Sequence, residues 1–417
     1  MNGFNRKKYL VGACSFVLFS FAAVVVRAQP NPDFVNISYG RYNLNKFDLW
    51  LAKSAKPTPV VIHFHGGGFI AGDKTTGIDA SLVNNLLARG IAVVSANYRL
   101  MNDTTFYPAP QRDAVRAIQF IRYNAAKYNI DPSRIGLSGG SAGANMSVWI
   151  GLHDEMADSN SPDPVERLST RVRCVGVYQA QTSNDPNWAF VKIAGTQEIY
   201  TRAADFYGVS VAALKTPSAA LQKLIDEASA LTHATADDPP VLIWYTDKMT
   251  NVPLPANANW DQVIHHPRFG VYLKDVLDTL RVETKVYWGN GGTINNPMPP
   301  LANIDFFEQK LKTISTGIGH SATENFGYEL RPNFPNPFNA ETIIKYHLPQ
   351  SGQVKLTIYD LTGKLVAILV DEMQGAGAYK KRWDGRDKSG RALPSGIYFY
   401  ELKTPSFAMT RKLALVK

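Results

Sequence analysis

A chain of 417 residues is too long for one typical hydrophobic core, so more than one domain is expected. Its formal net charge of +9 is unevenly distributed, because residues 29–326 hold 26 basic and 27 acidic residues whereas residues 327–417 hold 14 basic and 8 acidic ones. The large middle region is therefore neutral, which excludes an extended nucleic-acid-binding surface there.

Residues 1–28 have the pattern of a secretory signal peptide. Three basic residues at positions 6–8 precede eighteen mostly apolar residues, Tyr9 to Val26, and "VRA" follows as a small-residue cleavage site. A single membrane anchor is the alternative, because eighteen residues almost reach the length that spans a bilayer. The pattern predicts a protein exported to the outside or the cell surface. Cleavage would leave one cysteine in the chain, so no internal disulfide is expected.

Residues 29–314 alternate between apolar, strand-like runs and longer helical patterns, which indicates a mostly parallel sheet covered by helices on both faces. Strands are predicted at 59–65, 91–100, 134–139, 173–180, 240–246 and 283–289, and helices at 79–90, 112–129, 270–281 and 301–314. Residues 181–237 lie between two of these strands and are long enough for a small helical cap. Aromatic residues in this insertion predict either the cap's own core or an acyl or aryl pocket.

The pattern changes after this region. Residues 315–327 begin a stretch rich in Gly, Pro, Asn, Ser and Thr without helical or strand periodicity, which predicts a linker. Residues 328–417 contain short strand-like runs separated by Gly and Pro turns, such as "DLTGK" and "PSG". This spacing is typical of an all-β sandwich.

Two motifs in the middle region point to acyl-transfer chemistry. "HFHGGGF" at 63–69 follows a strand, and its glycines allow backbone amides to point at a developing oxyanion. "IGLSGGSAG" at 135–143 places Ser141 in a strand, sharp turn and helix, the context of a nucleophile elbow. Small neighbours suit a strained turn, and the helix that follows contributes backbone donors. The two motifs together predict a serine hydrolase site.

The segments "HGGGFIAGDK" and "RIGLSGGSAGANMS" resemble secreted members of the α/β-hydrolase superfamily, in the esterase and lipase branch with an HGGG loop and in its carbohydrate-esterase relatives that cleave feruloyl and acetylxylan esters. The resemblance covers roughly residues 57–315 and implies an α/β-hydrolase fold. It also implies that Ser141 is the nucleophile and that the amides of Gly67, Gly68 and Ala142 form the oxyanion hole. His65 matches a loop histidine with a structural role, whereas His63 is expected in the core.

The sequence departs from this family at the acid and the base. The family order is serine, acid, histidine, but "GNGGTINNPMPP" after the last predicted strand contains no histidine. Asp247 stands two positions before the usual place of the acid. His265 and His266 precede a predicted helix and lie on a loop expected at the same sheet edge as Ser141. We therefore predict His265 or His266 as the base and Asp247 as the acid, with His320 as the next candidate.

The C-terminal region has a second resemblance. "YELRPNFPNPFNAETIIKYHLPQSGQVKLTIYDLTGKLVAILV" and "WDGRDKSGRALPSGIYFYELK" resemble the immunoglobulin-like sorting domain of type IX secretion, which is related to the flagellar-hook-capping immunoglobulin module. The resemblance implies export across both membranes and a secretion machinery as partner. A carbohydrate-binding or spacer sandwich is the alternative.

The sequence therefore predicts an α/β-hydrolase domain with a helical cap, followed by an immunoglobulin-like sandwich. The expected function is hydrolysis of a small ester or an esterified carbohydrate, without a cofactor. No group of ligand-type residues at metal-site spacing is apparent, so no metal is expected. The alternative is a hydrolase fold whose triad has degenerated and that acts as a binding or scaffold module at the cell surface.

Overall fold

The computed structural model describes residues 28–312 except 103, 248 and 290–295, and residues 328–416 except 331–332, 334–337, 340, 349, 376 and 406. The expected signal peptide, apart from its last residue, the linker and His320 lie outside the described residues. Within the described residues, no helix combines the length and the apolar character needed to cross a bilayer.

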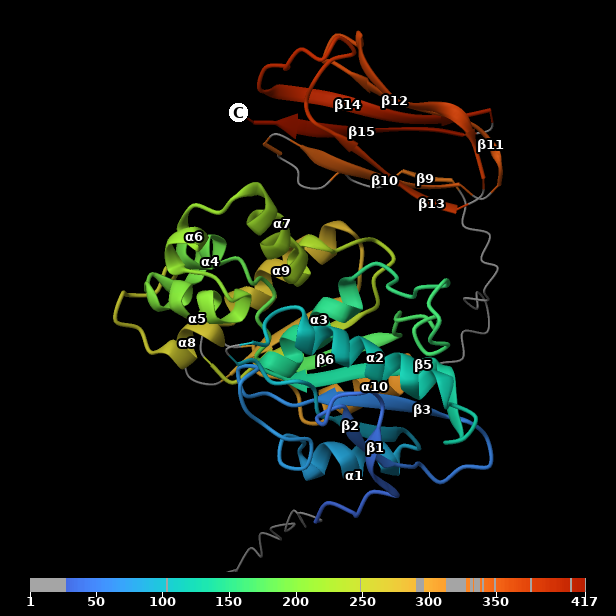
Figure 1. Ribbon diagram of the computed structural model, residues 1–417, viewed down its shortest axis with the longest axis vertical. Helices are drawn as coiled ribbons and strands as arrows, with labels where there is room; N and C mark the ends of the chain where they lie inside the picture. Colours follow the sequence, from blue (N-terminus) through green and yellow to red (C-terminus); the bar gives the residue numbers. More distant parts are fainter. Residues whose placement is uncertain are drawn as a thin grey trace, which may run out of the picture.

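The larger unit is built on an eight-stranded sheet with the order β1-β2-β4-β3-β5-β6-β7-β8 (Figure 1). The first two strands pair antiparallel, β2 also pairs antiparallel with β4, and the remaining pairs are parallel. The strands are β1 (Phe34–Ser38), β2 (Lys46–Trp50), β3 (Thr58–Phe64), β4 (Ala92–Ala96), β5 (Ile130–Gly140), β6 (Cys174–Tyr178), β7 (Val241–Tyr245) and β8 (Thr284–Trp288).

Helices cover both faces of this sheet. One core joins the strands to α1 and α10, and it includes Val61 of β3; the other joins them to α2, α3 and α9, and it includes the neighbouring Ile62. Successive side chains of a strand point to opposite faces, so a strand buried on both faces is apolar throughout. The helices are α1 (Ala80–Ala88), α2 (Ala109–Tyr123), α3 (Ala142–Leu152), α9 (Arg268–Thr279) and α10 (Ala302–Lys312).

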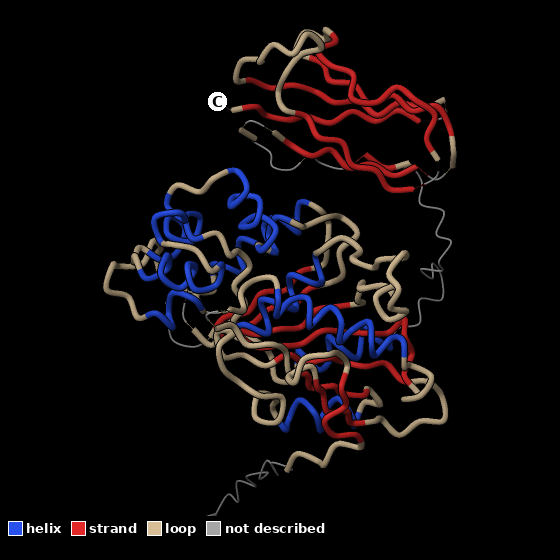
Figure 2. The backbone as a smooth tube through the Cα atoms, in the orientation of Figure 1, coloured by secondary structure: helices blue, strands red, loops and turns tan. Residues whose placement is uncertain are grey.

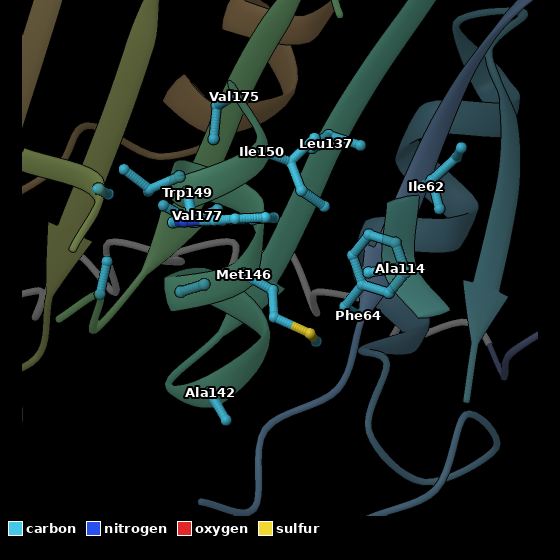
Figure 3. Packing of buried hydrophobic residues seen from close by; sticks show 14 of the residues in the cluster. Ile62, Phe64, Ala114, Leu137, Ala142, Met146, Trp149, Ile150, Val175 and Val177 are labelled. Carbon is cyan, nitrogen blue, oxygen red and sulfur yellow. The ribbon is translucent and has the colours of Figure 1, made fainter. Parts of the chain in front are cut away.

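Helix α3 packs against the centre of the sheet. Figure 3 shows part of this core, with Met146 and Ile150 of α3 beside Leu137 of β5 and with Val175 and Val177 of β6. All five side chains are fully or almost fully buried. The helix that starts next to Ser141 is therefore held by the core of the sheet.

A group of short helices between β6 and β7 forms the cap predicted for residues 181–237, and α8, between β7 and α9, joins it from outside that insertion (Figure 2). Its aromatic side chains contact one another and the sheet domain, as Phe206 does with Tyr107 at a ring-centroid distance of 5.3 Å. Tyr200, Phe206 and Tyr207 are buried, so these aromatic residues supply the core of the cap. The cap elements are α4 (Pro186–Ala189), a π-helical turn (Phe190–Ala194), α5 (Glu198–Tyr207), α6 (Val211–Lys215), α7 (Ala219–Ala228), a 3-10 turn (Ala230–Thr232) and α8 (Trp260–Ile264).

The C-terminal residues form two antiparallel sheets with the orders β13-β10-β9 and β12-β11-β14-β15. Their shared core includes Tyr346, Leu356, Trp383 and Tyr400. The predicted fold class, an α/β-hydrolase-type sheet followed by an immunoglobulin-like domain, is thereby confirmed. The strands are β9 (Glu329–Leu330), β10 (Thr342–Leu348), β11 (Gly352–Tyr359), β12 (Leu365–Gln374), β13 (Gly377–Trp383), β14 (Gly396–Thr404) and β15 (Phe407–Leu415).

Candidate active site

Ser141 occupies a strained turn between β5 and α3. Its backbone has φ 50° and ψ −114°, a region that side-chain-bearing residues rarely adopt. The amide of Ser141 donates a hydrogen bond to the carbonyl of Tyr178 on β6 at 3.0 Å, and the Ser141 carbonyl accepts from Asn145 in the first turn of α3 at 2.9 Å. The neighbouring strand and the helix thus hold the backbone in this strained conformation.

The glycines around Ser141 leave no room for a side chain. A Cβ atom at Gly143 would lie 2.0 Å from the carbonyl oxygen of Phe64, and one at Gly139 would lie 2.5 Å from backbone atoms of Gly143. At Gly140 a Cβ would lie 2.0 Å from the ring of Tyr178. The G-x-S-x-G spacing is therefore required by close approach of β3, β6 and α3.

The glycine loop after β3 passes beside the serine. Phe64 and Gly139 are neighbours in the β3–β5 ladder, so the two strands end at the same sheet edge. A Cβ at Gly66 would lie 3.5 Å from the Cβ of Ser141. Gly67 and Gly68 have φ 112° and 60° and are exposed.

These two amides and that of Ala142 are available as donors. Among the described residues, no protein acceptor is bonded to the amide of Gly67 or Gly68. Ala142 is the first residue of α3, and the first amides of a helix have no acceptor within it. The predicted oxyanion-hole residues therefore present unpaired donors at the edge where Ser141 lies.

The two histidines of the loop motif have structural contacts. His63 is buried between Ser138 Oγ at 3.2 Å and the Gly77 carbonyl at 2.9 Å, and burial lowers the pKa of His63 to about 4. His65 stacks on Tyr98 with ring centroids 4.3 Å apart, and burial also lowers the pKa of its ring. Both positions agree with the expectation of a core residue and a loop support.

The structure brings His265 to the serine. Nε2 of His265 lies 3.0 Å from Oγ of Ser141, although 124 positions separate the residues in the chain. His265 directly follows α8 and is largely buried. A neutral imidazole with its proton on Nδ1 would accept the serine proton through Nε2.

A carboxylate that sequence reasoning missed lies at the other ring nitrogen. Oδ1 of Asp261 is 2.8 Å from Nδ1 of His265, one helical turn away at i,i+4 spacing. The carboxylate touches the ring, but the angle of the contact does not satisfy a hydrogen bond, so Nδ1 is without one among the described residues. The Asp261 side chain is 68% exposed, so water weakens its interaction with the ring. The i,i+4 spacing in "WDQVIH" is the signal that could have indicated Asp261.

The predicted acid, Asp247, lies two residues beyond β7 in the same electrostatic neighbourhood. Its Oδ2 is buried without a hydrogen-bond partner among the described residues. Burial raises the pKa of Asp247, the charge of Asp261 raises it further, and His265 opposes both. Asp261 is thus the carboxylate in contact with His265, whereas Asp247 influences the ring only through its charge. The role of Asp247 as the acid stays a prediction.

His266 is not brought to Ser141. Its Nε2 lies 3.0 Å from the hydroxyl of Thr250, and its Nδ1 accepts a hydrogen bond from the backbone amide of Arg268 at 3.2 Å. Burial lowers the pKa of His266 to about 4. The two adjacent histidines predicted as possible bases thus have different contacts. His265 contacts the serine, whereas His266 supports the start of α9.

A large surface cleft lies away from this constellation. It has a volume of about 1230 Å³, and its lining includes Arg112 of α2, Trp149 near the end of α3, and Arg99 from the segment after β4. Ser141 and His265 are not among its lining residues. The chemistry suggested by Ser141 therefore belongs to the sheet edge and not to this cleft.

Comparison with known proteins agrees with the fold and with the loop and elbow motifs. The family model described as BD-FAE matches residues 47–259, which is half of the chain. The chain belongs to the BD-FAE family. A second model, described as the FlgD Ig-like domain, matches residues 339–406.

Curated relatives of this family member are ester hydrolases by name. It is 28% identical over 231 residues to the probable carboxylic ester hydrolase LipM of Mycobacterium tuberculosis, covering 52% of this chain and 48% of that protein. It is 40% identical over 90 residues to the carboxylesterase NlhH of the same organism, covering 22% of this chain and 28% of that one. The chain thus spans about half the length of these curated relatives or less.

A solved structure shows the same fold. The truncated form of a carbohydrate esterase from gut microbiota superposes with a TM-score of 0.51 and 22% identity, covering 67% of this chain and 96% of that one. The predicted resemblance to α/β-hydrolase esterases is confirmed, whereas the type IX assignment of the tail stays a prediction.

Proposed function

We propose that this protein is a secreted serine esterase that cleaves carboxylic esters through an acyl-enzyme on Ser141. The observation that carries the proposal is the 3.0 Å contact between Ser141 Oγ and His265 Nε2 at a strained elbow beside unpaired amides. A serine hydroxyl becomes a useful nucleophile when a neighbouring base accepts its proton. The alternative of a degenerate triad depended on the histidine missing after β8, and the contact with His265 argues against it.

In the proposed reaction His265 takes the serine proton as Oγ attacks the ester carbonyl carbon. The carbonyl oxygen becomes an oxyanion, which the amides of Gly67, Gly68 and Ala142 stabilise by hydrogen bonds. The imidazolium then gives its proton to the departing alcohol, and the acyl group remains on Ser141. Water, deprotonated by His265, attacks the acyl-enzyme, and the acid is released as Oγ regains the proton. Asp247 and Asp261 stabilise the imidazolium.

The proposed substrates are small acyl or aryl esters, including acetyl or feruloyl groups on polysaccharides. Family membership and the carboxylesterase names of its relatives support ester hydrolysis. The carbohydrate esterase that shares the fold motivates the carbohydrate part of the proposal. Export is proposed from the signal-like first 28 residues and from the C-terminal immunoglobulin-like domain, which would engage a secretion machinery.

The test is hydrolysis of 4-nitrophenyl acetate, methyl ferulate and acetylated xylan by the wild type, Ser141→Ala, His265→Ala and the double variant. Each single variant should lose several orders of magnitude in kcat/KM, and the double variant little more, because triad residues act as a unit. Additive losses, or a fully active Ser141→Ala variant, would refute the mechanism. Comparing the three substrates tests the substrate class separately.

A further inference from the structure

Three metal-ligating side chains outside the candidate active site converge at the junction of α3 and the cap. They are His153, which ends α3, Glu227 of α7, and His233, which follows the 3-10 turn. One potential ligand atom from each lies within 4.8 Å of the other two. The ester chemistry proposed above uses none of them.

The second nitrogen of each imidazole is already bonded to the backbone. Nδ1 of His153 lies 3.0 Å from the carbonyl of Asp154, and Nε2 of His233 lies 2.8 Å from the carbonyl of Glu227. When these nitrogens carry the protons, Nε2 of His153 and Nδ1 of His233 have free lone pairs. A histidine that binds a metal commonly donates its other N–H to a carbonyl in this way.

The free lone pair of His153 faces a carboxylate. Nε2 of His153 lies 2.9 Å from Oε1 of Glu227, and this contact lowers the pKa of Glu227. Two acceptors at this distance need either a proton or a cation between them. The imidazoles of His153 and His233 also lie against one another, with ring centroids 4.3 Å apart.

We propose that His153, Glu227 and His233 form a binding site for a divalent transition-metal ion, with Zn²⁺ as the best match. Two imidazoles and one carboxylate are a common zinc ligand set that leaves a fourth position for water. Ligand atoms around a tetrahedral zinc with bonds of about 2.0–2.1 Å lie about 3.3 Å apart. The three candidate ligand atoms lie within 4.8 Å of one another, so a pair at that limit would have to close by about 1.5 Å to reach this spacing.

Charges of both signs surround the site, because Lys345 also lies near it, and the ligand groups are held in place. His153 ends α3, and the C-terminus of a helix carries partial negative charge. The indole of Trp149 donates a hydrogen bond to the Glu227 carbonyl at 2.7 Å, the same oxygen that His233 contacts. His153 and Glu227 also line the cleft of about 1230 Å³, which gives an ion access from solvent. A bound metal would link cap helix α7 to the C-terminal end of α3. The N-terminal end of the same helix begins next to Ser141.

The test is equilibrium dialysis of the full chain, freed of metal by a chelator, against Zn²⁺ and separately against Co²⁺. We expect one ion per chain and, for Co²⁺, visible d–d absorption typical of a low-coordinate site. His153→Ala and His233→Ala should each weaken binding by more than about a hundredfold, since losing only an outer-shell partner costs about ten- to a hundredfold. His347→Ala, in the C-terminal domain, is the matched control and should bind like the wild type.

Glu227→Gln is a further variant that should keep the fold, because the half-exposed side chain of Glu227 is replaced by one of the same shape. This variant should also lose affinity for Zn²⁺. Excess Zn²⁺ should raise Tm by several degrees in the wild type and not in the variants, because only the folded site binds the ion. If the wild type binds no stoichiometric ion, or if the folded variants bind Zn²⁺ as tightly as the wild type, the proposal is overturned and the cluster is only a hydrogen-bonded contact between His153 and Glu227.

Discussion

The imidazole of His265 is influenced by two carboxylates of different character. Asp261 touches its Nδ1 but is mostly exposed, whereas Asp247 is more deeply placed and carries an unpaired oxygen. An exposed charge is screened by water, and a buried one interacts more strongly. The two acids are therefore expected to share the role that one acid has in the usual triad.

This sharing predicts the effect of removing each acid. Asp261→Asn and Asp247→Asn should each lower kcat/KM by about ten- to a hundredfold, and the double variant by about 10⁴-fold, the loss seen when a triad acid becomes an amide. Steady-state kinetics on 4-nitrophenyl acetate measure this. If Asp247→Asn alone equals the double variant, Asp247 is the sole acid. If neither change matters, no carboxylate orients His265.

Helix α8 is the element that delivers both His265 and Asp261. It has five residues, and so short a helix is not stable without caps and packing. The side chain of Asn259 caps it by accepting a hydrogen bond from the Asp261 amide at 2.8 Å, and Val263 is fully buried. Gln181 also donates a hydrogen bond to the carbonyl of Ile264 at 2.7 Å, so the position of the base depends on a cap, a buried apolar side chain and this bond.

Loss of this cap should reduce activity without touching the reacting atoms. Asn259→Ala should lower kcat by about tenfold, because small displacements of catalytic groups are costly, and should destabilise the domain by about 1 kcal/mol. Asn259→Asp restores a capping oxygen and should recover most of the activity. Kinetics and urea unfolding of both variants check this. Equal activity of Asn259→Ala and wild type would show that α8 is held by other contacts.

Close packing around Gly143 at the elbow predicts that an added methyl group is not tolerated there. Gly143→Ala would place a Cβ 2.0 Å from the Phe64 carbonyl, so the turn must shift, and we expect a destabilisation above about 3 kcal/mol with loss of hydrolysis. Gly90 has φ 65° but no atom within 4 Å of an added Cβ, so Gly90→Ala should cost only about 1–2 kcal/mol and keep activity. Chemical denaturation compares the two. If Gly143→Ala and Gly90→Ala lower the free energy of unfolding by similar amounts, the packing around Gly143 is not tight.

Most of the parallel sheet and the loop and elbow motifs were predictable from sequence, because buried parallel strands are apolar and glycines mark close approaches. Strands β1 and β2 were not predicted. The segment "KFDLW" contains Asp48, which is buried and paired with Lys74 at 2.7 Å, a partner 26 residues away that no local pattern reveals. Asp261 was missed for a similar reason, since a five-residue helix gives little periodicity.

From the sequence, the base could be narrowed to His265 or His266 but not assigned to one of them. His265 and His266 are adjacent, and their opposite orientations depend on how α8 ends and α9 begins. The contact to Thr250 that engages His266 comes from a loop without a distinctive pattern. Tertiary packing therefore decides which of two chemically equal residues reaches the serine.

The described residues form a sheet domain, which holds Ser141, His265 and the two carboxylates, and a C-terminal sandwich with its own core. We therefore predict that truncation after Ser315 leaves kcat/KM within about twofold and abolishes surface localisation in the cell that exports it. Hydrolysis by the purified truncated chain and surface labelling of cells measure the two effects. Loss of activity in a truncated chain that remains folded would contradict the separation of roles.

Labelling with a fluorophosphonate probe decides whether His265 activates Ser141, because the probe reacts with activated serines. Ser141 should be labelled in the wild type and in His266→Ala, and the label should be lost in Ser141→Ala and His265→Ala at equal folded concentration. Peptide mapping by mass spectrometry identifies the labelled residue. An unlabelled wild type, or labelling that persists in His265→Ala, would contradict the claim.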